Sequence, residues 1–212
     1  MKNPLTVWDK LIPDQPRNNE YYCGSDYCRA LYDLITRVSG LQPTLEAFNL
    51  VLSDKATLEE MGSNRVQLRL LELIVRLTGA KRVIEIGAFI GLSAMTMARA
   101  MPAGGKLITI EKFDGFVEIC RPNVAANGLS DRIEVLEGDA FEVLDRLPRD
   151  QPFDLAFIDG NKERYARLFE ALEPRVRPGG VILVDDVLFH GDVLNSPPKT
   201  GKGVNHAVCS ND

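Results

Sequence analysis

The sequence predicts one α/β domain with a doubly wound, mostly parallel sheet and additional helices at its N-terminus. Short apolar runs rich in Val and Ile alternate with helical stretches along the second part of the chain. Strands that are separated by helices require crossover connections, which make neighbouring strands parallel. The length of 212 residues, with 45% hydrophobic and 26% charged residues, suits one globular domain with a buried core.

The first 63 residues are expected to form an arm and helices outside the sheet. Prolines at positions 4, 13 and 16 in a polar stretch indicate an arm over residues 1–20. Helices are expected over 26–38, where Leu31, Leu34, Ile35 and Val38 follow helical spacing, and over 44–52. Residues 64–212 would form the core of the same domain.

The core is expected to begin with a helix over Arg65–Thr78, which ends at Gly79 because glycine favours the left-handed conformation at a helix C-terminus. Strand and helix patterns then alternate. Strands are predicted at Arg82–Ile86, Lys106–Ile110, Arg132–Leu136, Phe153–Ile158 and Val181–Val184, and helices at Leu92–Ala100, Gly115–Ala126, Phe141–Leu147 and Arg164–Leu172.

Composition argues against several classes of protein. No apolar run is long enough to cross a bilayer and no signal-type stretch begins the chain, so a cytoplasmic location is expected. The formal charge of −5 disfavours a long nucleic acid as partner. The four cysteines form no paired C-x-x-C motifs and are expected to be reduced.

The predicted first strand leads into a glycine turn. Gly87 and Gly91 allow a tight turn, and the next helix would present free N–H groups to a carboxylate or phosphate. Glu111 ends the second strand, where an acid can accept hydrogen bonds from ribose hydroxyls. The G-x-x-x-G spacing differs from the G-x-G-x-x-G of dinucleotide folds. The alternative is a nucleotide-free turn beside a surface acid.

Acidic residues end two later strands. Asp159 follows one strand, and Asp185 and Asp186 follow the next. If the strands are neighbours, the three carboxylates converge and repel one another unless a cation compensates. Oxygen ligands favour a hard ion such as Mg²⁺. The alternative is that these aspartates cap a helix or solvate a loop.

Four stretches in this order resemble the cation-dependent catechol and caffeoyl-CoA O-methyltransferase family, a class I group that uses S-adenosylmethionine. They are Leu77–Gly87 with its glycine turn, Gly138–Ala140, Phe157–Tyr165 and Asp185–Gly191. The resemblance covers about Leu58 to Val193.

The resemblance implies a role for each matching residue. Met61 and Ser63 would flank the cofactor, Glu85, Gly87, Phe89, Gly91 and Ser93 would surround its methionine part, Glu111 would bind the ribose, and Asp139 and Ala140 would border the adenine. Asp159, which would also contact the cofactor, would hold Mg²⁺, Mn²⁺ or Ca²⁺ with Asp185 and Asp186. Lys162 would be the base that removes the hydroxyl proton of the acceptor.

Four departures from the family are expected. Asp186 stands where the family usually has asparagine, Phe189 where it often has tryptophan, and Ile90-Gly91-Leu92-Ser93 where the family often has threonine and tyrosine around the glycine. The C-terminal strands of the family are expected to be truncated or to diverge. His190 is expected to be an ordinary loop residue.

The expected function is methyl transfer to a hydroxyl of a catechol-like or other small aromatic acceptor. The alternatives are methyl transfer to hydroxyuridine in transfer RNA, a dinucleotide-binding oxidoreductase and a non-catalytic cofactor-binding protein. No membrane partner is expected, and the apolar faces of the N-terminal helices offer a surface for a homodimer.

Overall fold

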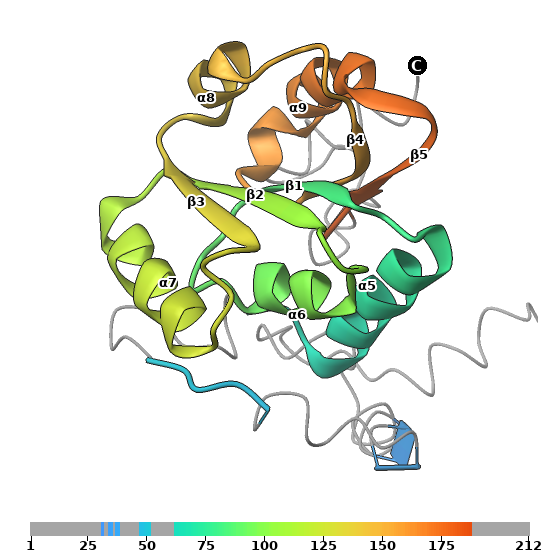
Figure 1. Ribbon diagram of the computed structural model, residues 1–212, viewed down its shortest axis with the longest axis vertical. Helices are drawn as coiled ribbons and strands as arrows, with labels where there is room; N and C mark the ends of the chain where they lie inside the picture. The colour runs from blue at the N-terminus through green and yellow to red at the C-terminus, as the bar shows by residue number, and fades with distance from the viewer. Residues whose placement is uncertain (1–30, 32–33, 36, 39–46, 52–61, 188–212) are drawn as a thin grey trace, which may run out of the picture.

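A five-stranded parallel sheet is the centre of the molecule, as the sequence predicts (Figure 1). The computed structural model describes residues 31, 34–35, 37–38, 47–51 and 62–187. The strands are β1 (Arg82–Ile86), β2 (Lys106–Glu111), β3 (Ile133–Glu137), β4 (Phe153–Ile158) and β5 (Val176–Val184), in the spatial order β3-β2-β1-β4-β5.

The strand order reverses between β1 and β4. Successive strands β1, β2 and β3 extend the sheet in one direction, whereas β4 and β5 extend it in the other. Ile86 at the end of β1 is in register with Ile110 of β2 and Ile158 of β4, so the carboxyl ends of these strands lie level at one edge. Ligands of open α/β sheets bind at such a reversal.

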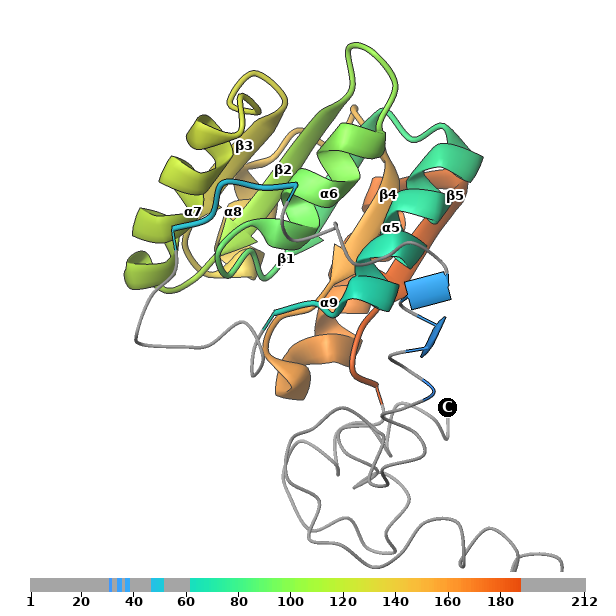
Figure 2. The same ribbon diagram turned by 90° about the horizontal axis from the view of Figure 1, so that it is seen from below.

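Helices cover both faces of the sheet (Figure 2). One face carries α5 (Arg65–Thr78), α6 (Leu92–Ala100) and α7 (Asp114–Ala126), and the other carries α8 (Ala140–Arg146) and α9 (Tyr165–Leu172). Two short 3₁₀ turns, η1 (Lys162–Arg164) and η2 (Glu173–Arg175), flank α9. No helix within the described ranges is long and apolar enough to cross a membrane.

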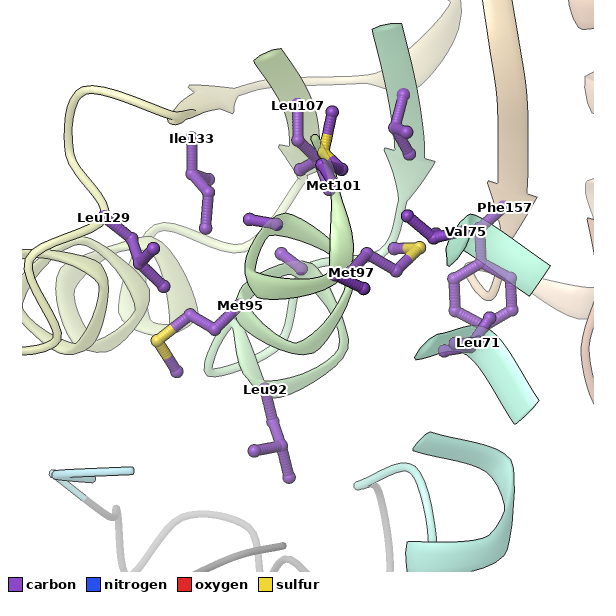
Figure 3. Packing of buried hydrophobic residues seen from close by; sticks show 14 of the residues in the cluster. Leu71, Val75, Leu92, Met95, Met97, Met101, Leu107, Leu129, Ile133 and Phe157 are labelled. Atoms are coloured by element: carbon purple, nitrogen blue, oxygen red, sulfur yellow. The ribbon is translucent and has the colours of Figure 1, made fainter. Parts of the chain in front are cut away.

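A separate apolar core fills each side of the sheet. On the side of α6, Met95, Met97 and Met101 pack among Leu107 and Ile133 (Figure 3). Eight of the nine residues of α6 are buried, because this helix lies between α5, α7 and the sheet. The first turn of α6, which follows the glycine turn, is therefore held firmly.

Most of the predicted elements agree with the structure to within one residue at each end. The strand predicted at Val181–Val184 is longer and begins at Val176, because Pro178 and two glycines lie on an edge strand of the described sheet, where proline is tolerated. Leu31, Leu34, Ile35 and Val38 are helical, and their side chains are exposed.

The prediction of a helix over 44–52 is wrong for its described part, residues 47–51, which form a turn followed by irregular backbone. The backbone groups of Asn49 and Val51 bond to side chains of α7 and of its C-cap instead of to one another. Long-range partners of this kind override local helical propensity.

Candidate active site

A cavity of about 610 Å³ opens at the carboxyl edge of the sheet. Its wall combines the glycine turn after β1 with the ends of the neighbouring strands. Of the residues predicted for the site, it includes Ser63, Gly87, Phe89, Ser93, Glu111, Asp139, Ala140, Asp159, Lys162, Asp185 and Asp186. Met61, Phe189 and His190 lie outside the described residues.

The glycine turn fits tightly against the end of β4. Gly87 has a φ of 100°, and a Cβ at this position would lie 2.2 Å from the carbonyl oxygen of Asp159. Phe89 has a φ of 48°, an unfavourable conformation for a bulky residue. Its amide donates to Oε2 of Glu111 at 2.8 Å, which helps to hold the turn in this conformation.

Glu111 is buried and fixed at the end of β2. Its Oε2 accepts from the amide of Phe89, and its Oε1 accepts from the amide of Phe113 at 3.0 Å. A carboxylate has about four lone-pair directions. Two acceptor positions therefore stay available for hydroxyl groups in the cavity, as a ribose would require.

Two predicted cofactor residues do not line the cavity. Glu85 lies within β1 with no exposed surface and accepts a hydrogen bond from Thr109. The pKa of Glu85 is raised to about 8, because burial and the charges of Asp159 and Glu111 raise it more than hydrogen bonds from Ser93 and Thr109 lower it. Its Oε1 has no hydrogen-bond partner in the described part of the chain. Gly91 faces α7, where an added Cβ would lie 2.9 Å from Sγ of Cys120.

An ion pair that the sequence analysis missed joins the two sides of the cavity. Arg164 of η1 donates to Oδ2 of Asp139 at 2.5 Å, and its guanidinium lies 4.4 Å from the centre of the Phe141 ring. Asp139 also caps α8 by accepting from the amide of Phe141. Arg164 and this amide hold the pKa of Asp139 below its ordinary value. Arg164 lies within a recognised stretch, but nothing local links it to Asp139.

The acidic loop after β4 contains a half-buried lysine. Nζ of Lys162 lies 2.7 Å from Oδ1 of Asp159 and 3.8 Å from Oδ2 of Asp186. The pKa of Asp159 is raised to about 6. Burial and the charges of Asp185 and Asp186 raise it, and Lys162 partly offsets this rise. Asn161, not Asp159, caps the following turn. Asp186 has a φ of 51°, which asparagine and aspartate tolerate best among residues with a side chain.

The donor set of this loop suits a hard cation. Asp159, Asp185 and Asp186 all line the cavity and offer only oxygen atoms. Over the residues with described positions, no three carboxylate, thiol or imidazole groups lie close enough together to hold a metal ion. The ammonium group of Lys162 lies between two of the carboxylates.

A family model described as O-methyltransferase matches residues 39–209. The chain belongs to the O-methyltransferase family. Tricin synthase 1 from Oryza sativa subsp. japonica is 34% identical over 176 residues, which cover 80% of this chain and 69% of that protein. Catechol O-methyltransferase from Mycobacterium tuberculosis is 36% identical over 155 residues, 73% of this chain and 70% of that protein. Caffeoyl-CoA O-methyltransferase 2 from Zea mays is 35% identical, but the match spans only 58% of this chain and 48% of the maize protein.

Solved structures of O-methyltransferases have the same fold. The enzyme from Bacillus cereus, in complex with SAH, has a TM-score of 0.75 and 28% identity, with 86% of this chain and 84% of that one covered. TomG from Streptomyces achromogenes, in complex with SAM, has a TM-score of 0.68 and 26% identity, with 99% and 83% covered. The resemblance to catechol and caffeoyl-CoA O-methyltransferases is therefore confirmed, and the dinucleotide oxidoreductase is excluded.

Proposed function

We propose that this chain transfers the methyl group of S-adenosylmethionine to a hydroxyl of a small, catechol-like aromatic acceptor with the help of a divalent cation. The observation that carries the proposal is the single cavity that Glu111 and the glycine turn share with Asp159 and Lys162. Residues expected to bind the cofactor and residues expected to bind the acceptor thus line the same cavity. Relatives named catechol O-methyltransferase and caffeoyl-CoA O-methyltransferase support this acceptor class.

The glycine turn and its neighbours would bind the cofactor. Glu111 would accept hydrogen bonds from the ribose hydroxyls through its two remaining lone-pair directions. Ser93, in the first turn of α6, would bind the methionine carboxylate together with nearby backbone N–H groups. Asp139 and Ala140 would border the adenine from the start of α8.

Asp159, Asp185 and Asp186 would hold the divalent cation once their carboxylates move closer together than they lie in this structure. A cation bound there would polarise the acceptor oxygens and stabilise developing negative charge. An aromatic ring with two adjacent hydroxyls offers two oxygens to the cation site. Binding through both oxygens would orient one hydroxyl toward the cofactor. Positioning of this kind can supply roughly 7 kcal/mol or more of the barrier.

Lys162 would act as the base. Its side chain is 15% exposed and begins from a short turn beside the cavity. In the neutral form, Nζ would accept the hydroxyl proton of the acceptor, and the proton would then leave to solvent through the open cavity. Proton transfer to a positioned group of this kind contributes about 10²- to 10⁴-fold to a rate.

Calorimetry with S-adenosylhomocysteine, followed by a methyl-transfer assay on catechol with mass detection, tests this function. EDTA should abolish transfer, excess Mg²⁺ should restore it, and cofactor binding should persist throughout. Asp159→Asn should reproduce the effect of EDTA, whereas Asp145→Asn, at an exposed surface site, should not. Full transfer in excess EDTA would exclude the cation, and the absence of S-adenosylhomocysteine binding would exclude the function itself.

A further inference from the structure

A short segment without regular secondary structure, residues 47–51, crosses the outer surface of α6 and α7 (Figure 2). We call this segment the strap. Arg99 of α6 donates to the carbonyl of Ala47 at 2.8 Å and lies 3.9 Å from the centre of the Phe48 ring. The rest of the strap bonds to two asparagines, Asn123 within α7 and Asn127 at the C-cap of this helix.

Each asparagine pairs with both backbone groups of one strap residue. Oδ1 of Asn127 accepts from the amide of Asn49 at 3.0 Å, and its Nδ2 donates to the carbonyl of Asn49 at 2.9 Å. Asn123 treats Val51 in the same way, at 2.6 Å and 3.2 Å. The two carboxamides therefore act as the edge of a β-sheet for the strap.

The side chain of Asn127 also accepts from Arg99 at 3.2 Å and donates to the carbonyl of Asn123 at 2.8 Å. Asn123 differs from Asn127 in that it contacts the glycine turn. Its side chain is fully buried, and Nδ2 also donates to the carbonyl of Ile90 at 3.0 Å. Ile90 lies in the glycine turn, between Phe89 and Gly91. One carboxamide thus bonds to the strap on one side and to the glycine turn on the other.

Both N–H donors and one acceptor position of this carboxamide are engaged. An asparagine has two N–H donors, and here one faces Val51 and the other faces Ile90. The amide of Val51 fixes which end of the group carries the oxygen. If the strap leaves, the carboxamide is free to rotate away from Ile90, and the buried carbonyl loses its donor.

We propose that Asn123 is a positioning residue that couples docking of the strap to the conformation of the glycine turn, and thereby to cofactor affinity. The last step rests on the proposed function, in which this turn binds the cofactor. The coupling is reciprocal, so bound cofactor should also hold the strap in place.

Hydrogen exchange of the full chain without ligand tests the coupling directly. Asn123→Asp keeps the acceptor for Val51 and removes both donors. Asn127→Asp makes the same change at a site that contacts the strap, Arg99 and the carbonyl of Asn123 but not the glycine turn. Asn123→Asp should speed exchange of the amides of Phe89 and Gly91, which bond to Glu111 and Ala88. Asn127→Asp should speed exchange at Asn49 and leave the turn unchanged. Equal turn exchange in both variants would overturn the proposal.

Binding of S-adenosylhomocysteine gives the second readout. Asn123→Asp should weaken affinity roughly tenfold, the cost of stranding a buried carbonyl, while Asn127→Asp should stay within about twofold. Bound S-adenosylhomocysteine should slow exchange of the Val51 amide in the unaltered chain but not in Asn123→Asp. Unchanged Val51 exchange on binding would overturn the proposal. No binding by the unaltered chain would refute the cofactor assignment, while turn exchange would still decide the role of Asn123.

A second pair of variants leaves the buried core intact. Val51→Pro deletes the amide that orients Asn123, at a residue that is 54% exposed, and Asn49→Pro deletes the corresponding amide opposite Asn127. Val51→Pro should speed turn exchange and weaken S-adenosylhomocysteine binding, and Asn49→Pro should do neither. Wild-type turn exchange in a folded Val51→Pro chain would show that the strap does not control the turn.

Discussion

The hydroxyl of Thr109 on β2 lies 2.5 Å from Oε2 of Glu85 on β1, with both side chains buried between the strands and their covering helices. The pKa of Glu85 is about 8 here, against an ordinary value of 4.5. The contribution of this residue to stability is therefore fully present below about pH 4.5 and is lost as the pH rises through about 8.

Glu85→Gln should remove this pH dependence. Between about pH 4.5 and 8, the free energy of unfolding of the unaltered chain should fall relative to that of the variant, by up to about 1.4 kcal/mol per pH unit. Chemical denaturation at several pH values measures this difference. Glu137→Gln, at an exposed site, is the control, and parallel stability curves for the unaltered chain and Glu85→Gln would contradict the assignment.

Substitution of two glycines with positive φ should separate conformational strain from steric contact. Gly79→Ala, at the C-terminus of α5, meets no atom within 4 Å and should cost about 1 to 2 kcal/mol through its φ alone. Gly87→Ala adds a clash with the Asp159 backbone and should cost clearly more. Thermal unfolding compares the stability of the two variants. Equal losses of stability would mean that the glycine turn moves away from the Asp159 backbone at little cost.

Glu111→Ala should weaken S-adenosylhomocysteine binding by about 1 to 3 kcal/mol, because it leaves the amides of Phe89 and Phe113 without their acceptor and removes the ribose partner. Glu137→Ala is the matched control, because Glu137 ends the neighbouring strand in register with Glu111 but does not line the cavity. Calorimetry measures the S-adenosylhomocysteine affinity of both variants, and only Glu111→Ala should show the loss. NAD should bind to neither the unaltered chain nor the variants, and tight NAD binding in this cavity would refute the cofactor assignment.

Lys162→Met should reduce methyl transfer by about 10²-fold or more while S-adenosylhomocysteine binding changes little. Loss of the ammonium group should also raise the pKa of Asp159 further, since Lys162 is what lowers it now. Single-turnover assays with saturating Mg²⁺ measure the chemical step. Arg167→Met, which removes a cation on α9 that contacts the Phe141 ring, is the control. A comparable loss in both variants would point to general damage near α9.

Local patterns were enough to predict the order of strands and helices in the core, because apolar runs, glycine turns and strand-end acids are local signals. They also brought most of the predicted site residues that the structure describes to the cavity, since the carboxyl ends of parallel strands meet at one edge. Contacts between distant residues could not be predicted. Asn123 and Val51 are 72 positions apart, and no sequence pattern near Val51 predicts that its backbone will pair with a helix. Glu85 was assigned to the cofactor by its position in a recognised stretch, but its inward direction on β1 buries it.

The pairing of the strap with α7 depends on a match between two different repeats. Residues four apart on a helix are separated by about 6 Å along its axis, and residues two apart in an extended chain by about 6.6 Å. The carboxamides of Asn123 and Asn127 therefore reach backbone groups at Asn49 and Val51 with little distortion. Because only main-chain atoms of the strap take part, its exposed side chains are free to vary in sequence. The spacing of the two asparagines is not free to vary: one residue inserted between them would turn one carboxamide about 100° around the helix, away from the strap.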